Sequence, residues 1–204
     1  MCSSDLPGYT HKEDIVTATS ACAAGGVTTS FAMPNVDPPP NSPDRLAAMI
    51  DLYEQKAIID WNINPAGTVP EHIPALAEMG IAAFKVFMVV DTGRSYPHMP
   101  GIGVHHHGKL LEIFETVGPT GVPLMVHPHD QELMDHIEHG WWARGERDFR
   151  AYAKAYAAYD GIIWDTAAAF LLRLQQATGT HLHLLHTRSE EHTSELQSHH
   201  DLVC

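Results

Sequence analysis

Five short runs rich in apolar or β-branched residues occur along the chain, and a segment with helical spacing separates each run from the next. A strand that is apolar on both faces must be covered on both, as in a parallel sheet with helices packed against it. No glycine-rich dinucleotide-binding motif follows any of the runs, so we predict part of a (β/α)-barrel rather than a doubly wound sheet. The predicted strands are residues 27–33, 59–63, 82–90, 123–127 and 181–187.

The starts of the helices are predicted from residues that can cap a free backbone N–H group. Thr10 and Glu13 form a capping-box pattern, which opens a helix that stops at Gly25. Ser42 is the expected cap of the next helix, with a proline at its first position. A further cap is expected at Thr68, and two or three helices are expected between the last two strands.

Three of the predicted strands hold side chains that can bind a metal ion, namely Lys85, His127 and His186. In a barrel, polar side chains at the carboxyl ends of the strands converge on the active site. Lys85 has apolar neighbours on both faces of its strand, and a buried ammonium group is costly unless its charge is compensated. A neutral lysine that reacts with carbon dioxide gives a carbamate anion able to bridge two divalent metals, and the histidines can add neutral nitrogen ligands.

Simpler structural roles for these residues remain open at the level of the sequence. A single histidine at a strand end is usually a packed or surface residue, and a single strand lysine usually points to solvent. His129 is expected at the rim of the site. The run from His105 to His107 fits a lid edge or adventitious metal binding and is not assigned to a site. Cys22 is expected to be a small packing residue in a helix.

Several motifs, in the same order, resemble the cyclic amidohydrolase family of dihydroorotases, hydantoinases and allantoinases. They are GYTHKED, AAGGVTTSFAMPNVDPPP, FKVFM, a strand-end histidine and HLLHT, and they span nearly all of residues 7–187. The resemblance implies that carboxylated Lys85 bridges two zinc ions and that His127 and His186 bind the second. It also implies an incomplete (β/α)8 TIM barrel in which strands two to six are present and strands one, seven and eight are missing.

One further residue is assigned by the resemblance. Asn35 matches the position that holds the substrate's carboxylate in dihydroorotases, although an asparagine after Met-Pro could equally form only the turn. The family's HxH motif is expected just before Pro7, but residues 1–6 stand there instead. The arginine that follows this motif in dihydroorotases is absent as well. The catalytic aspartate is expected beyond Thr187. We therefore expect the general base to lie outside this chain and the chain alone to be inactive.

The two ends of the chain do not continue the pattern between them. Residues 188–198 read as the translation of a widely used short-read sequencing adapter, residues 199–204 fit its continuation, and residues 1–6 fit its reverse strand. A genuine polar tail is the alternative at each end. We expect a partial barrel domain at residues 7–187 between two adapter-derived tails, residues 1–6 and 188–204.

Composition limits the compartment and the partners. The formal net charge of −13 disfavours nucleic acid as the main partner, and no apolar run is long enough to span a membrane. No secretory signal is visible at the start of the chain. With Cys2 and Cys204 assigned to the tails, only Cys22 remains. A disulfide framework is then impossible, and a reducing cytoplasm is expected.

These observations lead to one expected function and to alternatives. We expect the whole protein to be a zinc-dependent hydrolase of carbon–nitrogen bonds in a small cyclic amide or ureide, with dihydroorotase placed first because of Asn35. A hydantoinase, dihydropyrimidinase or allantoinase remains open, because FKVFM is equally typical of these enzymes. A non-catalytic homologue that acts as an assembly partner is an alternative of another class. A histidine-rich metal-storage module is disfavoured because most histidines are dispersed, and the whole protein is expected to be a homo-oligomer.

We expect the gene to depart from the printed sequence at both ends. Genomic DNA read through both junctions should not encode MCSSDL and RSEEHTSELQS in one frame with the segment between them. A single uninterrupted frame that contains both tails would show that they are genuine. Cys2 and Cys204 would then belong to the protein, together with Cys22.

Overall fold

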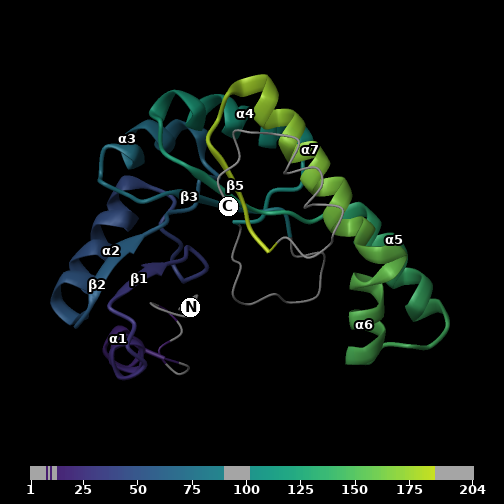
Figure 1. Ribbon diagram of the computed structural model, residues 1–204, viewed down its shortest axis with the longest axis horizontal. Helices are drawn as coiled ribbons and strands as arrows, with labels where there is room; N and C mark the ends of the chain where they lie inside the picture. Colours follow the sequence, from purple (N-terminus) through teal and green to yellow (C-terminus); the bar gives the residue numbers. More distant parts are fainter. Residues whose placement is uncertain (1–7, 9, 11–12, 90–101, 187–204) are drawn as a thin grey trace.

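The computed structural model describes residues 8, 10, 13–89 and 102–186. The expected adapter-derived tails, residues 1–6 and 188–204, lie outside the described residues, as does Thr187 at the end of the last predicted strand. Within the described part, helices run along the outside of an arch and the strands lie on its inside (Figure 1). The chain is therefore of the α/β class, as its apolar runs predict.

The described residues form five short strands, in the predicted order, and all of the pairings among them are parallel. β1 pairs with β2, and β3, β4 and β5 form a second sheet in that order. A bridge between Ala66 and Lys85 joins the two sheets: the Lys85 N–H donates to the Pro65 carbonyl (2.8 Å), and the Gly67 N–H donates to the Lys85 carbonyl (3.0 Å). The strands are β1 Thr29–Ala32, β2 Asp60–Ile63, β3 Phe84–Phe87, β4 Leu124–His127 and β5 Leu182–Leu184.

Helices fill the connections between successive strands and precede the first one. They are α1 Ile15–Ala24, α2 Pro43–Lys56, α3 Ile73–Ala77, α4 His107–Val117, α5 Gln131–Ala143, α6 Phe149–Tyr156 and α7 Ile162–Thr178, with short 3-10 turns at η1 Pro70–His72, η2 Gly118–Thr120 and η3 Ala158–Gly161. Strand–helix–strand connections between parallel neighbours are the repeating unit of (β/α) folds. None of the described helices is long and apolar enough to cross a bilayer.

The predicted helix starts are correct in one of three cases. α2 begins at Pro43 after Ser42, as expected. The capping box at Thr10 is wrong, because α1 is capped by Asp14, whose carboxylate accepts from the Thr17 N–H at 2.8 Å. The cap at Thr68 is also wrong. Prolines in the first turns of η1 and α3 lack an N–H, and this segment forms a 3-10 turn followed by a short helix.

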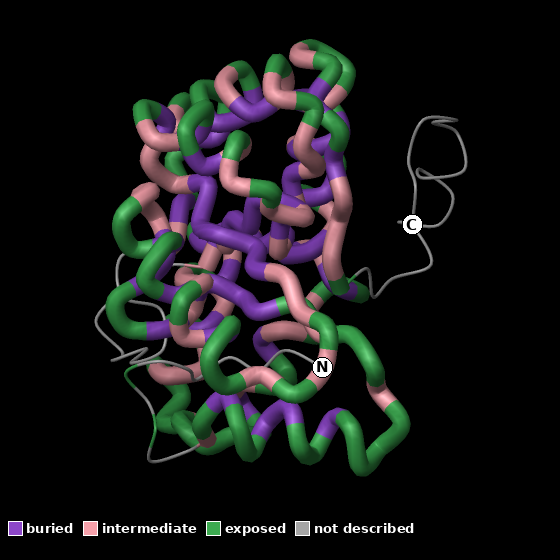
Figure 2. The backbone as a smooth tube through the Cα atoms, turned by 90° about the vertical axis from the view of Figure 1, so that its left-hand side faces the viewer, coloured by how far each residue is buried: buried purple, intermediate pink, exposed green. Residues whose placement is uncertain are grey.

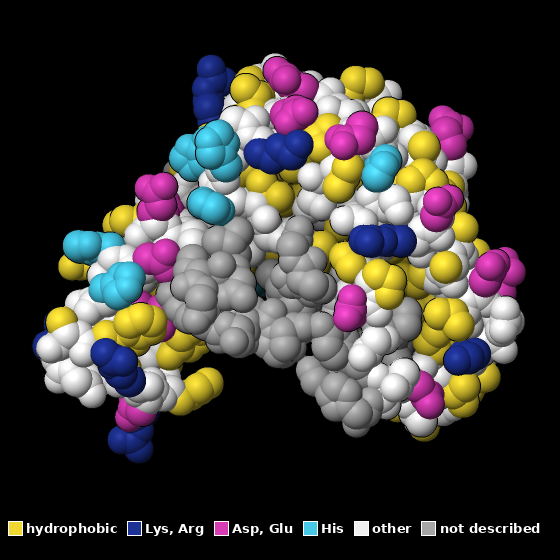
Figure 3. All heavy atoms as spheres, turned by 180° about the vertical axis from the view of Figure 1, so that it is seen from behind, with side chains coloured by type: hydrophobic (Ala, Val, Ile, Leu, Met, Phe, Trp, Pro, Cys, Tyr) yellow, Lys and Arg dark blue, Asp and Glu magenta, His cyan; other side chains and the backbone are white. Residues whose placement is uncertain are grey.

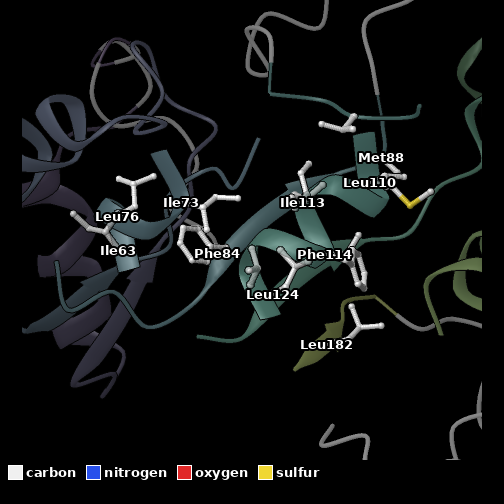
Figure 4. Packing of buried hydrophobic residues seen from close by; sticks show 14 of the residues in the cluster. Ile63, Ile73, Leu76, Phe84, Met88, Leu110, Ile113, Phe114, Leu124 and Leu182 are labelled. Atoms are coloured by element: carbon white, nitrogen blue, oxygen red, sulfur yellow. The ribbon is translucent and has the colours of Figure 1, made fainter. Parts of the chain in front are cut away.

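The main core lies between the sheet and the outer helices. Side chains alternate between the two faces of a strand, so Phe84, Val86, Leu124 and Val126 share one face, and all four are fully buried. Figure 4 shows these strands covered by the apolar side of α4, which supplies Leu110, Ile113 and Phe114. Burying one such side chain contributes about 1.5–3 kcal/mol, so this layer is the main source of stability.

Burial follows the same division of layers along the chain. Buried residues run through the middle of the body, and exposed residues lie mainly on its outer turns (Figure 2). On the face seen in Figure 3, acidic and basic side chains are interspersed over the described surface. Cys22 is buried in α1, as expected for a packing residue.

The inner face of the sheet carries the alternate residues of each strand. On β1 this face includes Phe31, which is 45 % exposed although it is a large aromatic residue. On β3 it includes Lys85 and Phe87, which are paired in register with Met125 and His127 of β4. The inner face is thus mixed and partly polar, whereas the outer face is apolar.

We predict that this chain, expressed alone, associates through the edges of its sheet. In the described part, no strand pairs with the outer edge of β1 or of β5, and unpaired edges beside apolar side chains recruit other strands. Phe31→Lys should raise the fraction of soluble protein in a sedimentation assay, because a charge at an edge strand opposes pairing. Phe149→Lys is the matched control: Phe149 is 82 % exposed but lies on α6, away from both edges. Equal solubility of the two variants would contradict the prediction, and so would a soluble monomer formed by the chain without either substitution.

Candidate functional site

Lys85 is a fully enclosed cation on the inner face of β3, with only 2 % of its surface exposed. Its Nζ donates to the Val86 carbonyl at 3.4 Å and lies 4.0 Å from the centroid of the Phe87 ring. An ammonium group over an aromatic face is stabilised by the ring quadrupole. The expected burial of Lys85 is confirmed, and its amine is directed toward the carboxyl end of its strand.

The two strand-end histidines come together beside this strand. His127 is the last residue of β4 and is half-buried, and His186 follows the end of β5. Their ring centroids are 4.9 Å apart, with the planes inclined at 66°. The backbone of His186 has φ 57°, in the left-handed region, where non-glycine residues other than Asn, Asp and His are uncommon. Two imidazoles at this separation can supply nitrogen ligands to one ion.

Aromatic side chains hold His127 in place. Its ring lies 6.0 Å from that of Phe87 and 5.4 Å from that of Trp164, which is buried in the first turn of α7. His129 belongs to the same aromatic group and is only 1 % exposed, with ring centroids 5.6 Å from Tyr156 and 6.0 Å from Trp164. The expectation that His129 lies at the rim is therefore wrong. The helices after β4 fold over it, and nothing in the local sequence predicted that contact.

His183 is a titratable residue that the sequence analysis did not single out. It pairs in register with Met125, which in turn pairs with Lys85, so His183 and Lys85 lie on the same face two strands apart. Burial lowers the pKa of His183 below its ordinary value of 6.5, and the charges of His181 and Lys85 lower it further. The signal in the sequence was its position in HLHLLH, where His183 alternates with Leu182 and Leu184 and therefore lies on the face opposite to these leucines.

Two asparagines follow the neighbouring strands β1 and β2. Asn35 is half-buried and Asn64 is 1 % exposed. In the described part of the chain, no donor reaches the buried Oδ1 of either side chain. The signal in the sequence for Asn64 is its place directly after the predicted strand 59–63, because the strand-end rule applies to an amide as it does to a histidine.

The histidine run shares a pocket with His129. His105, His106 and His107 are exposed, and together with His129 and residues of α5 and α7 they line a pocket of about 500 Å³. The ring of His107 is stacked on Phe170, with centroids 4.1 Å apart. Among the described residues, no three His, Cys, Asp or Glu side chains are grouped closely enough to hold a metal ion.

The predicted ligands therefore form a partial set. The structure brings His127 and His186 together and places Lys85 on the neighbouring strand, on the face to which His127 also belongs by register. A third donor beside the two imidazoles would have to come from Lys85 after carboxylation, because an ammonium group has no lone pair to offer. His127 and His186, together with Lys85 after carboxylation, are therefore chemically suited to a metal centre.

Comparison with known proteins identifies the relatives of this chain. It is 31 % identical to a dihydroorotase of Lactiplantibacillus plantarum over 97 % of this chain and 46 % of that protein. It is 29 % identical to an allantoinase of Deinococcus radiodurans, over 90 % of this chain and 40 % of that protein. The chain thus spans less than half of the length of either. No protein-family model matches it.

Solved structures show the same fold. An L-hydantoinase from Arthrobacter aurescens matches 90 % of this chain with a TM-score of 0.77 at 24 % identity, and the match covers 39 % of that enzyme. A dihydroorotase from Campylobacter jejuni matches 86 % of this chain with a TM-score of 0.57 at 13 % identity. The helices and parallel strands described above are therefore arranged as in a part of these enzymes.

We predict that burial of His183 makes the stability of the metal-free protein depend on pH. Its pKa is lower in the folded state than the unfolded value of 6.5, so the unfolded chain binds more protons between these two pKa values. Stability should be complete above about pH 6.5 and fall as the pH drops through that window. His183→Gln should flatten this part of a plot of unfolding temperature against pH, and His139→Gln, at an exposed position on α5, is the control. An unchanged slope in His183→Gln would refute the assignment.

Proposed function

Since this chain is related to the dihydroorotases and allantoinases of the cyclic amidohydrolase family, we propose that the whole protein hydrolyses a carbon–nitrogen bond in a cyclic amide or ureide. The observation that carries the proposal is the convergence of His127 and His186 beside the strand that holds buried Lys85. A dihydroorotase is placed first, and a hydantoinase, dihydropyrimidinase or allantoinase is the alternative within the same chemistry.

The proposed metal ligands are carboxylated Lys85, His127 and His186, which would hold two zinc ions with further ligands from outside this chain. When bound, a pair of zinc ions would lower the pKa of a bound water toward neutrality. The same ions would polarise the carbonyl to be attacked. Burial of Lys85 excludes water from its amine, and packing of Phe87 and Trp164 against the His127 ring restricts its orientation. Ligands that are held in place before the metal binds lose less conformational freedom on binding.

The arrangement of the strands supports an incomplete barrel. β1 pairs with β2, and β3, β4 and β5 pair in chain order, always in parallel. The parallel bridge from Ala66 to Lys85 joins the two sheets, so the carboxyl ends of the strands lie at one end of the combined sheet. We propose that they are strands two to six of a (β/α)8 barrel, with strands one, seven and eight in the rest of the protein. The HxH ligands and the general base would lie in that remainder, so this chain alone would not hydrolyse the substrate.

Asn35 is the proposed substrate-binding residue. It lies just beyond the carboxyl end of β1, at the end of the sheet where barrel enzymes bind their substrates. Its amide can donate through Nδ2 to a carboxylate and accept through Oδ1 from an N–H group. A ring that bears both groups, as dihydroorotate does, is the substrate that uses both ends of this side chain.

The ligand role of Lys85 is tested by Lys85→Ala in the whole protein. The variant should lose the metal pair, measured as metal per chain by atomic emission. Its kcat/KM for dihydroorotate or hydantoin should fall by at least about a thousandfold, roughly 4 kcal/mol of transition-state stabilisation. Lys109→Ala is the control, because Lys109 lies in a surface ion pair with Glu112 at 3.0 Å. Two metals per chain and unchanged turnover in Lys85→Ala would make Lys85 a structural lysine.

A further inference from the structure

Asn64 is a buried amide at the carboxyl end of β2. Its backbone N–H donates to the Ala32 carbonyl at 2.9 Å, which continues the ladder between β1 and β2 by one residue. By the alternation of the strand, its side chain shares the inner face with Ala66, which is paired with Lys85. Asn64 therefore lies on the side of the sheet that carries the proposed metal ligands.

The amide of Asn64 is poorly satisfied within the described chain. Its Nδ2 has only the sulfur of Met33, a weak acceptor, at 3.9 Å, and its Oδ1 is buried with no donor in reach. Buried polar atoms are nearly always hydrogen-bonded, and leaving one without a partner is costly. An apolar residue would therefore stabilise the fold better at this position.

Asn62, two residues earlier on the same face, shows the contrast. Its Nδ2 donates to the Gly80 carbonyl at 3.1 Å, and its Oδ1 accepts from the Ala82 N–H at 2.9 Å. Asn62 thus acts as a structural amide that joins β2 to the segment before β3. Asn64 has no comparable contacts, so packing of the described chain does not explain it.

We propose that Asn64 is a substrate-binding residue whose Oδ1 accepts a hydrogen bond from a ring N–H of the cyclic amide. The inference rests on the proposed function and deepens it. A second acceptor of the same kind, the Oδ1 of Asn35, follows the neighbouring strand. Acceptors without donors are complementary to a ligand that brings N–H groups, as cyclic ureides do. A ring without such groups would leave the oxygens unsatisfied and be rejected.

The test compares Asn64→Leu with Asn62→Leu in the whole protein, with hydantoin and its two N-methyl derivatives as probes. Affinity is measured by equilibrium binding to metal-depleted protein and as KM in the metal-loaded enzyme. Stability is measured as the unfolding temperature without ligand. If Asn64→Leu does not give soluble protein, Asn64→Ala, which needs less space, is compared in the same way.

Asn64→Leu should weaken hydantoin binding about tenfold, because the ring N–H loses its acceptor. It should also abolish the preference for hydantoin over the methyl derivative that lacks this N–H, and it should leave the unfolding temperature equal or higher. Asn62→Leu should lower the unfolding temperature and leave the affinity unchanged.

A lower unfolding temperature for Asn64→Leu with unchanged affinity would overturn the inference, because Asn64 would then be a structural amide like Asn62. Unchanged affinity and unchanged stability would overturn it as well. In both cases the wild-type protein still binds a cyclic amide, so the proposed function stands. If the wild type binds none of hydantoin, dihydroorotate and allantoin, the proposed function fails and this inference fails with it.

Discussion

Parallel pairing of short strands is the constraint on which the other features of this molecule depend. Because every ladder from β1 to β5 is parallel, all five carboxyl ends lie at one end of the sheet. Helices must therefore return the chain to the opposite end before each new strand. This geometry gives the sheet an outer face that the helices bury. It also brings Asn35, Asn64, His127 and His186, far apart in the sequence, to the same end of the sheet.

The two faces of the sheet have different physical roles. The outer face is built from fully buried aliphatic and aromatic side chains, and their contacts with α4 and α7 supply the hydrophobic stabilisation. The inner face holds Lys85, His183 and Asn64, each of which costs free energy to bury. Stability from the outer layer offsets that cost, so polar groups can be kept where a ligand can meet them.

The aromatic residues after β4 link these two roles. Trp164 belongs to α7, a helix that packs in the outer layer, and its ring also lies against both His127 and His129. The packing of α7 therefore determines how His127 is held. A substitution in α7 that shifts this helix would affect the candidate site without touching any of its proposed ligands.

The sequence by itself determined the α/β class, the order of the five strands, and the burial of Lys85, because apolar strand runs separated by segments with helical spacing indicate which faces are covered. It also placed Lys85, His127 and His186 at successive strands. It did not predict the cap of α1 by Asp14, because several polar residues there compete for the same N–H groups. Only the tertiary structure decided that His127 and His186 are neighbours, that His129 is buried by Tyr156 and Trp164, and that Asn62 is satisfied while Asn64 is not. Those facts depend on contacts between segments distant in the chain, and the local pattern of a strand carries no information about what lies across from it.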